Sequence, residues 1–180
     1  MTIKIYTKVG DQGYTKQVTG KMVPKYDLQI EALGDIDELD SYLGVVIANL
    51  SDQCQELLNT LQDRQRDLYE LESDIVVKRH KEITAATVEF LEQQIDELNQ
   101  KIPKTTHFIL PGGSITATHL HYARTVARRA ERAMAKLNDE QQELAPACLK
   151  YINRLSDYLF ILARYANVLD GVEEVKSKIN

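Results

Sequence analysis

Apolar residues recur at helical spacing along most of the chain. Between residues 26 and 50, leucine and isoleucine return every three to five positions, which is the spacing of one face of an α-helix. The same period returns in segments that begin near residues 54, 84, 114 and 144 and end near residues 75, 102, 137 and 169. Polar or helix-breaking residues separate these segments, including a predicted turn at Asn138 and Asp139. Short connections between helices of similar length predict an all-α fold, an up-and-down five-helix bundle.

The first 25 residues depart from this pattern. They hold Gly10, Gly13 and Gly20 together with five lysines, in a chain that is acidic overall. Ile3 and Ile5 alternate with polar residues over a stretch that is too short to predict a strand. We therefore expect residues 1–25 to form an ordered arm and residues 26–170 to form the helical bundle, within a single domain spanning 1–180.

Composition narrows the class of protein. The formal net charge of -5 and the pI near 5.4 argue against a general nucleic-acid binder, which needs clustered Lys and Arg. Cys54 and Cys148 fall at apolar positions of helical patterns, which predicts small core residues. The N-terminus lacks the apolar run of a signal peptide, and no stretch has the roughly 18 apolar residues of a membrane span. These features favour a cytoplasmic protein.

The run Thr7-Lys8-Val9-Gly10-Asp11-Gln12-Gly13-Tyr14-Thr15 is the first candidate for chemistry. Glycines let a backbone fold tightly and present N–H groups to an anion, while Lys8 can add charge and Thr15 a hydroxyl group. The run predicts a phosphate-binding loop or, alternatively, an ordinary surface turn. It is not a Walker A loop, because the spacing G-x-x-x-x-G-K-[ST] is missing.

The fourth predicted helix carries a charged stripe beside its apolar face. At about 100° per residue, Arg124, Arg128 and Glu131 lie within roughly 60° of one another, while Arg129 and Arg132 point further out. Two guanidinium groups one turn apart suit bidentate phosphate contacts. The alternative is a solvated helix with ordinary ion pairs.

The fifth predicted helix has a second stripe, formed by Asn153, Asp157, Phe160 and Arg164, opposite its leucine face. A phenylalanine there predicts a face that meets a ligand or another subunit. On the first helix, Asp40 projects close to the apolar face, so its carboxylate should have a partner.

His119 and His121 are two residues apart and do not face each other on a helix. We therefore expect these histidines to form no metal site, and we expect no resident metal ligands in the chain.

Four segments in this order resemble the PduO-type ATP:cob(I)alamin adenosyltransferases. They are YTKVGDQGYT at residues 6–15, EALGDIDEL at residues 31–39, the stretch from FILPGGS at residues 108–114 to RRAER at residues 128–132, and NRLSDYLF at residues 153–160. Each segment alone is modest evidence, whereas all four together are highly specific. The resemblance spans residues 3–169, nearly the whole chain.

The resemblance implies an enzyme that transfers the adenosyl group of ATP to the cobalt of a reduced cobalamin. It implies a homotrimer with active sites between subunits, Mg²⁺ accompanying the ATP, and a reductase as a further partner. Residues 1–25 would then be the ATP-binding arm, and Phe108 would sit beside the corrin ring and exclude a lower axial cobalt ligand. Asp35 and Arg124 match a pair that bridges two subunits. The remaining matched positions are the ATP contacts, namely Thr7, Lys8, Gly10, Asp11, Gly13, Thr15, Lys25, Arg128, Glu131 and Asn153.

Three positions depart from the family pattern. Met22 and Gln29 stand where arginine is usual, and Asp40 stands where asparagine is common. The lost positive groups put ATP affinity in question. The three departures support one rival, a non-catalytic trimer that binds nucleotide or corrinoid as a carrier or regulator. A third alternative, a purely structural bundle, would leave the Gly10–Gly13 run and the stripe of Arg128 and Glu131 without purpose. For Phe108, the alternative to a catalytic wedge is a side chain that fills the core.

Overall fold

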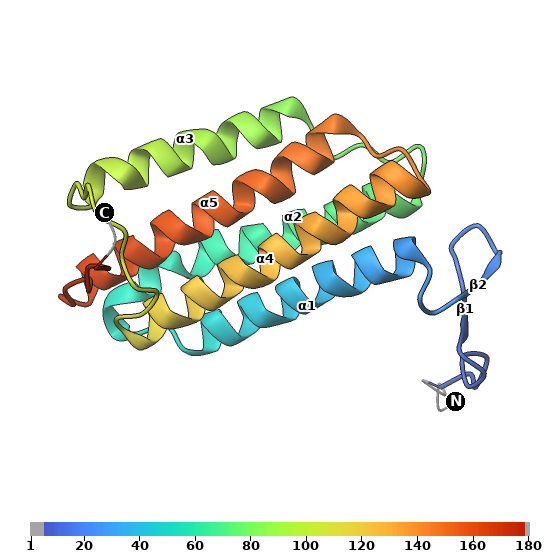
Figure 1. The fold of residues 1–180 in the computed structure, drawn as a ribbon, viewed down its shortest axis with the longest axis horizontal. Coiled ribbons are helices and arrows are strands. Elements are labelled where there is room, and N and C mark those ends of the chain that lie inside the picture. The colour runs from blue at the N-terminus through green and yellow to red at the C-terminus, as the bar shows by residue number, and fades with distance from the viewer. Residues whose placement is uncertain (1–5, 179–180) are drawn as a thin grey trace.

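Five long helices form the molecule, and successive helices run in opposite directions (Figure 1). The computed structural model describes residues 6–178. The elements are β1 (Tyr14–Lys16), β2 (Met22–Pro24), α1 (Leu28–Ala48), the 3-10 helix η1 (Asp52–Leu57), α2 (Leu58–Val76), α3 (Ala85–Lys101), α4 (Ile115–Glu140) and α5 (Pro146–Leu169). The predicted all-α, up-and-down five-helix bundle is therefore confirmed.

Side-chain caps fix where several helices begin. Asp27 accepts a hydrogen bond from the backbone N–H of Gln29 at the start of α1, and Ser114 accepts one from Ala117 at the start of α4. The turn predicted at Asn138 and Asp139 is wrong, because α4 continues to Glu140. The Asn138 side chain instead accepts a hydrogen bond from the N–H of Leu144, four residues beyond the end of the helix.

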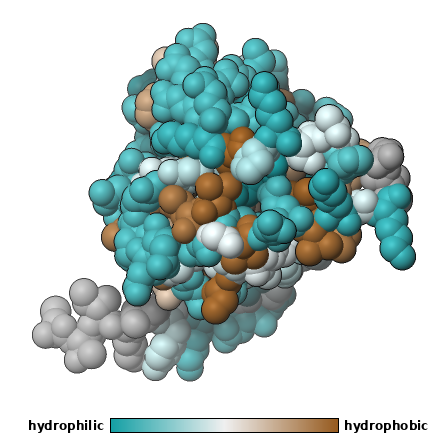
Figure 2. Space-filling model, turned by 90° about the vertical axis from the view of Figure 1, so that its left-hand side faces the viewer, coloured by the Kyte–Doolittle hydropathy of each residue, from teal (hydrophilic) through white to brown (hydrophobic). Residues whose placement is uncertain are grey.

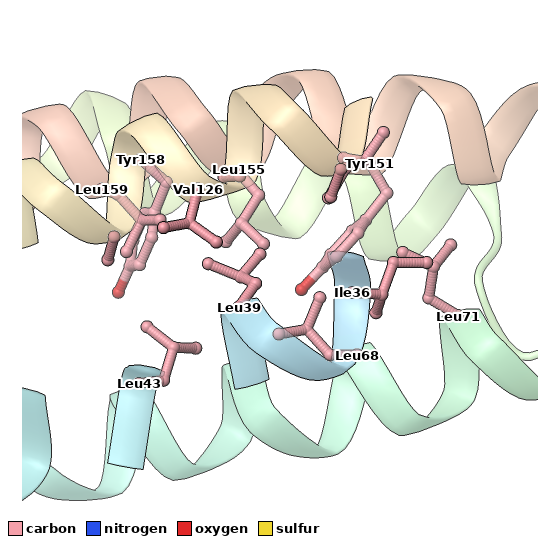
Figure 3. Packing of buried hydrophobic residues seen from close by; sticks show 14 of the residues in the cluster. Ile36, Leu39, Leu43, Leu68, Leu71, Val126, Tyr151, Leu155, Tyr158 and Leu159 are labelled. Atoms are coloured by element: carbon pink, nitrogen blue, oxygen red, sulfur yellow. The ribbon is translucent and has the colours of Figure 1, made fainter. Parts of the chain in front are cut away.

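The core lies between α1, α2, α4 and α5. Leucines of α1 and α2 point toward two large tyrosines of α5 in Figure 3: Leu39, Leu43, Leu68, Leu71, Tyr151 and Tyr158. The small face of α4, with Ala123, Ala127 and Ala130 fully buried, lets neighbouring helices approach closely. Both cysteines are buried and unbridged, as expected of small core residues.

The arm and the residues that follow α5 lie at opposite ends of the bundle (Figure 1). β1 and β2 pair as an antiparallel hairpin that projects beyond the start of α1, with Thr15 opposite Val23. Residues after α5 turn back, and Lys176 forms an isolated β-bridge with Ile109 in the connection between α3 and α4. None of the described helices is both long and apolar enough to span a membrane.

Candidate active site

Lys25 lies against the glycine turn of the arm. Its backbone N–H donates to the carbonyl oxygen of Gly13 at 2.9 Å, and a Cβ atom added at Gly10 would come within 3.2 Å of the Lys25 Nζ. The N–H of Gly13 donates to the carbonyl oxygen of Gly10 at 3.2 Å, and Gly13 has φ +82°, a conformation that favours glycine. The predicted loop is thus a tight turn with an ammonium group beside it.

The other predicted arm residues flank this turn. Lys8 has φ 62°, which is uncommon for a residue with a side chain, and its ammonium group lies 6.0 Å from the centre of the Tyr6 ring. Thr7 accepts a hydrogen bond from the N–H of Val9, and Asp11 is exposed. Thr15 lies on β1 and is half-buried. The turn places cationic and hydroxyl groups together on a surface that is open to solvent.

The polar stripes predicted on the fourth and fifth helices meet. Asn153 of α5 donates a hydrogen bond from Nδ2 to Oε1 of Glu131 on α4 at 2.6 Å. Arg128 is exposed one turn earlier on α4, and within residues 6–178 its guanidinium group forms no ion pair or hydrogen bond. An exposed guanidinium group beside a fixed amide–carboxylate pair is available to a phosphate.

Arg124 and His121 form a partly desolvated cluster on the same side of α4. Nε of Arg124 and both ring nitrogens of His121 are buried without a hydrogen-bond partner among the described residues. Burial, followed by the charge of Arg124, lowers the pKa of His121 to about 4, so the ring is neutral at physiological pH. The His121 ring lies 6.0 Å from the ring of Phe160 on α5.

Arg129 is not the outward-pointing side chain that helical spacing suggests. Its Nε lies 3.4 Å from Oδ1 of Asp35 on α1, and its Nη2 pairs with Glu38. Arg124 is not the partner of Asp35 within one chain. Arg129 thus partly neutralises the acidic face of α1, formed by Asp35 and Glu38. Arg124 and Arg128 on α4 form no ion pair among the described residues.

Arg164 does not belong to the outer stripe in which its spacing places it. It is buried, and its guanidinium group pairs with both carboxylate oxygens of Glu174 at 2.8 to 3.1 Å. The reason is that residues 172–178 fold back over α5, a long-range contact that a helical period does not show. Asn153 and Asp157 remain exposed, and Phe160 is half-buried.

Phe108 is exposed, with 68% of its surface accessible. It lies in the connection between α3 and α4, at the end of the bundle opposite the arm (Figure 1). Figure 2 looks at that end and shows apolar surface between hydrophilic groups, and the exposed apolar residues there include Leu110, Ile115, Val172 and Val175. The alternative in which Phe108 fills the core is therefore wrong.

The structure also shows residues that sequence reasoning missed. Buried Asn167 on α5 holds the Pro-Gly-Gly turn, since its Nδ2 donates to the carbonyl oxygen of Gly112 at 3.1 Å and its Oδ1 accepts from the N–H of Ser114 at 2.9 Å. Gly113 has φ +119° and sits so close to Asn167 that any Cβ atom would clash. The paired glycines were a signal for such a close approach.

The three positions that depart from the family pattern have different surroundings in the structure. Gln29 is buried and donates to Gln142 at 2.6 Å, and Gln142 donates to the carbonyl oxygen of Ile75, so this position links α1 to the end of α4 and to α2. Met22 is exposed on β2. The carboxylate of Asp40 was expected to have a partner, but its Oδ1 is buried without a hydrogen bond among the described residues.

Comparison with known proteins places these features in context. Residues 5–166 match the family described as Cobalamin adenosyltransferase. A corrinoid adenosyltransferase of Bacillus subtilis is 40% identical over 179 residues, covering 97% of this chain and 92% of the relative. A human corrinoid adenosyltransferase is 38% identical and covers 95% of this chain and 72% of its own length.

Solved structures are similar over the same range. A variant of a PduO-type ATP:corrinoid adenosyltransferase from Lactobacillus reuteri, complexed with cobalamin and ATP, superposes with a TM-score of 0.93 at 37% identity. That match covers 97% of both chains. A second variant of the Lactobacillus reuteri protein, complexed with ATP, gives a TM-score of 0.92 at 37% identity.

Proposed function

The chain belongs to the cobalamin adenosyltransferase family, and we propose that it transfers the 5′-deoxyadenosyl group of ATP to the Co(I) atom of a reduced corrinoid, with release of triphosphate. One observation carries the proposal. The fold resembles that of an enzyme solved with cobalamin and ATP, and it bears a cationic arm together with an Arg128 that has no side-chain partner among the described residues and lies beside the Glu131–Asn153 pair. In this chain the side chain of Phe108 is exposed to solvent.

The reaction needs no protein nucleophile. The electron pair of Co(I) attacks C5′ of ATP, the C5′–O bond breaks, and triphosphate leaves with the bonding electrons while cobalt becomes Co(III). The protein must hold C5′ in line with cobalt, and such positioning supplies several kcal/mol of the barrier. It must also stabilise the charge that develops on the triphosphate.

The groups proposed to bind ATP divide between the arm and the polar stripes of α4 and α5. Lys8 and Lys25, beside the backbone N–H groups of residues 10–13, would hold the triphosphate, and Arg128 would add a charge-assisted contact. The Glu131–Asn153 hydrogen bond fixes the side chains next to Arg128. Asp11 and Thr15 would complete the contacts.

Mg²⁺ is proposed to enter with ATP. No group of three metal-ligating side chains occurs within the described part of the chain. Mg²⁺ commonly keeps several waters and binds substrate phosphates with only one or two carboxylates, so the triphosphate itself would supply its main ligands. An ATP-consuming reaction also fits the cytoplasmic location expected from the sequence.

Phe108 is proposed to act on the corrinoid. Co(II) is difficult to reduce while a lower axial ligand stabilises it, and an apolar ring that occupies the ligand's place eases the reduction. The exposed side chain of Phe108, surrounded by other exposed apolar residues, is suited to that contact. A reductase would supply the electron at this stage.

We propose a homotrimer with sites between subunits, and the separation of these groups supports a site that two chains share. The connection that carries Phe108 precedes α4, whereas Gln141 at the other end of α4 hydrogen-bonds to Asp27 at the base of the arm. The 26 residues of α4 span roughly 40 Å, which is too far for one ATP to reach both groups of the same chain. The acidic α1 face of one subunit would meet the Arg124 face of the next.

Mixing the protein with MgATP and chemically reduced cobalamin tests the proposal. We expect the absorbance spectrum of adenosylcobalamin to appear and triphosphate to be released in equal amount. Binding of ATP and cobalamin without product would favour the non-catalytic carrier or regulator. Absence of any ATP-dependent thermal shift would favour the purely structural bundle.

A further inference from the structure

The segment that carries Phe108 is held by the C-terminal tail, residues 172–178. The N–H of Ser177 donates to the carbonyl oxygen of Phe108 at 2.7 Å, and the N–H of Leu110 donates to that of Val175 at 2.8 Å. Ile109 and Lys176 form the bridge between these two bonds. Backbone pairing with the tail therefore fixes the position and orientation of the backbone at Phe108.

Packing behind the segment does not fix it. A cavity of about 590 Å³ lies between this connection, the end of α5 and the tail, and it is lined by His107 and Ile109 but not by Phe108. Successive side chains of an extended segment point to opposite sides, so Phe108 and Leu110 project outward while their neighbours face the cavity. With open space behind it, the segment is supported by backbone pairing with the tail on one side, and Asn167 holds the adjoining turn at Gly112 and Ser114.

The tail is in turn anchored by one buried ion pair. Nε of Arg164 lies 2.8 Å from Oε1 of Glu174, and Nη2 lies 2.9 Å from Oε2. The same Nη2 donates to the carbonyl oxygen of Pro103, where the connection begins, at 2.9 Å. Only 6% of the Arg164 side chain and 17% of the Glu174 side chain are exposed. A bidentate guanidinium–carboxylate pair is both strong and specific in its geometry.

We propose that Arg164 and Glu174 are a positioning pair for the corrinoid reaction. By anchoring the tail, they hold the Phe108 backbone where the ring can displace the lower axial ligand of cobalt. Neither residue touches a substrate in this arrangement, and both act through the tail. The inference rests on the proposed function and deepens it, because it names what sets the position of Phe108.

Two variants weaken the support by different routes. Glu174→Ala removes the ion pair, with Glu173→Ala, an exposed neighbour, as the matched control. Ser177→Pro removes the N–H that donates to Phe108 and leaves the ion pair intact. Phe108→Ala and the double variant Phe108→Ala/Glu174→Ala complete the set. The readout is the electron paramagnetic resonance spectrum of cob(II)alamin bound with MgATP, which reports whether cobalt keeps an axial ligand.

In the wild-type protein we expect a fraction of bound cob(II)alamin without an axial ligand. Glu174→Ala and Ser177→Pro should reduce that fraction strongly, and they should slow turnover from cob(II)alamin by about tenfold or more, since a misplacement of about 1 Å can cost a hundredfold in rate. Turnover from supplied cob(I)alamin and ATP affinity should change much less. The double variant should resemble Phe108→Ala alone, because the pair acts through that ring.

Three results would overturn the positioning role. Glu174→Ala and Ser177→Pro could match Glu173→Ala, or all assays could fall equally together with the melting temperature. The double variant could also lose activity additively. If the wild-type protein forms no adenosylcobalamin from cob(I)alamin, the proposed function itself fails, and this result is separate from the other three.

Discussion

Arg128 and Arg129 are adjacent in sequence, but their side chains make different contacts. Arg129 reaches across to the acidic residues of α1, Asp35 and Glu38, whereas Arg128 forms no side-chain bond among the described residues. Helical spacing places the two arginines on different faces of α4 but cannot identify α1 as the partner of Arg129. Arg128, which has no side-chain partner in the described part of the chain, is the arginine proposed to bind ATP.

Arg128→Ala should therefore weaken ATP binding or turnover. A charge-assisted phosphate contact is typically worth about 1.5–3 kcal/mol, so we expect a loss of roughly tenfold or more. Arg129→Ala, the matched control, should mainly cost stability, by about 0.2–1 kcal/mol as for other exposed pairs. Isothermal titration with ATP and steady-state kinetics measure both. Equal losses in ATP affinity would contradict the assignment.

Phe108→Ala should separate chemistry from stability. Truncating a buried phenylalanine costs about 3–5 kcal/mol, but Phe108 is mostly exposed, so the melting temperature should barely change. Conversion that starts from cob(II)alamin and a weak reductant should fall strongly, and conversion from cob(I)alamin should fall less. Phe90→Ala, at an exposed phenylalanine of α3, should leave both rates unchanged. An equal loss in both assays would refute the wedge.

The helices were predictable at the scale of elements, whereas the arm hairpin and the tail were not. Repeated apolar positions and capping residues such as Thr84 and Ser114 determine where helices lie, because both signals are local. β1 and β2 have three residues each, too few to show a period. The burial of Arg164 depends on Glu174, which lies ten residues away beyond the end of α5.

The packing of α1 against α2 places acidic groups close together. Burial, followed by the charges of Asp37 and Asp40, raises the pKa of Glu72 to about 7 from its ordinary 4.5. The unfolded chain releases this proton at lower pH than the folded chain. The contribution of Glu72 to the free energy of unfolding is therefore greatest below about pH 4.5. This contribution is lost as pH rises through about 7.

Glu72→Gln should remove this dependence. Denaturant unfolding at a series of pH values should show the variant more stable than the wild type above about pH 7, by about 1–3 kcal/mol, with the difference vanishing near the ordinary pKa. Glu89→Gln, at an exposed position of α3, is the control and should follow the wild type. A difference between Glu72→Gln and wild type that does not change with pH would contradict the prediction.

At the scale of the whole molecule, Arg124 and the acidic face of α1 are suited to contacts with a second chain. Arg124 has a buried Nε without an acceptor among the described residues. We propose that it meets the acidic face of α1 in another copy, where Asp35 and Glu38 also pair with Arg129. A contact between two different faces of identical subunits forms a ring when its rotation closes and an open filament when it does not. Sedimentation velocity should show a trimer at micromolar concentration, and a clean monomer would contradict a site between subunits.

The central claim is adenosyl transfer at a site that combines the arm of one chain with the Phe108 end of another. Co-expressing Lys25→Ala and Phe108→Ala chains, with a different tag on each, yields mixed trimers that can be purified through both tags. Some of their sites combine an unaltered arm with an unaltered Phe108, so adenosylcobalamin formation from cob(II)alamin should recover well above that of either variant alone. Mixed trimers no more active than the separate variants would contradict the claim.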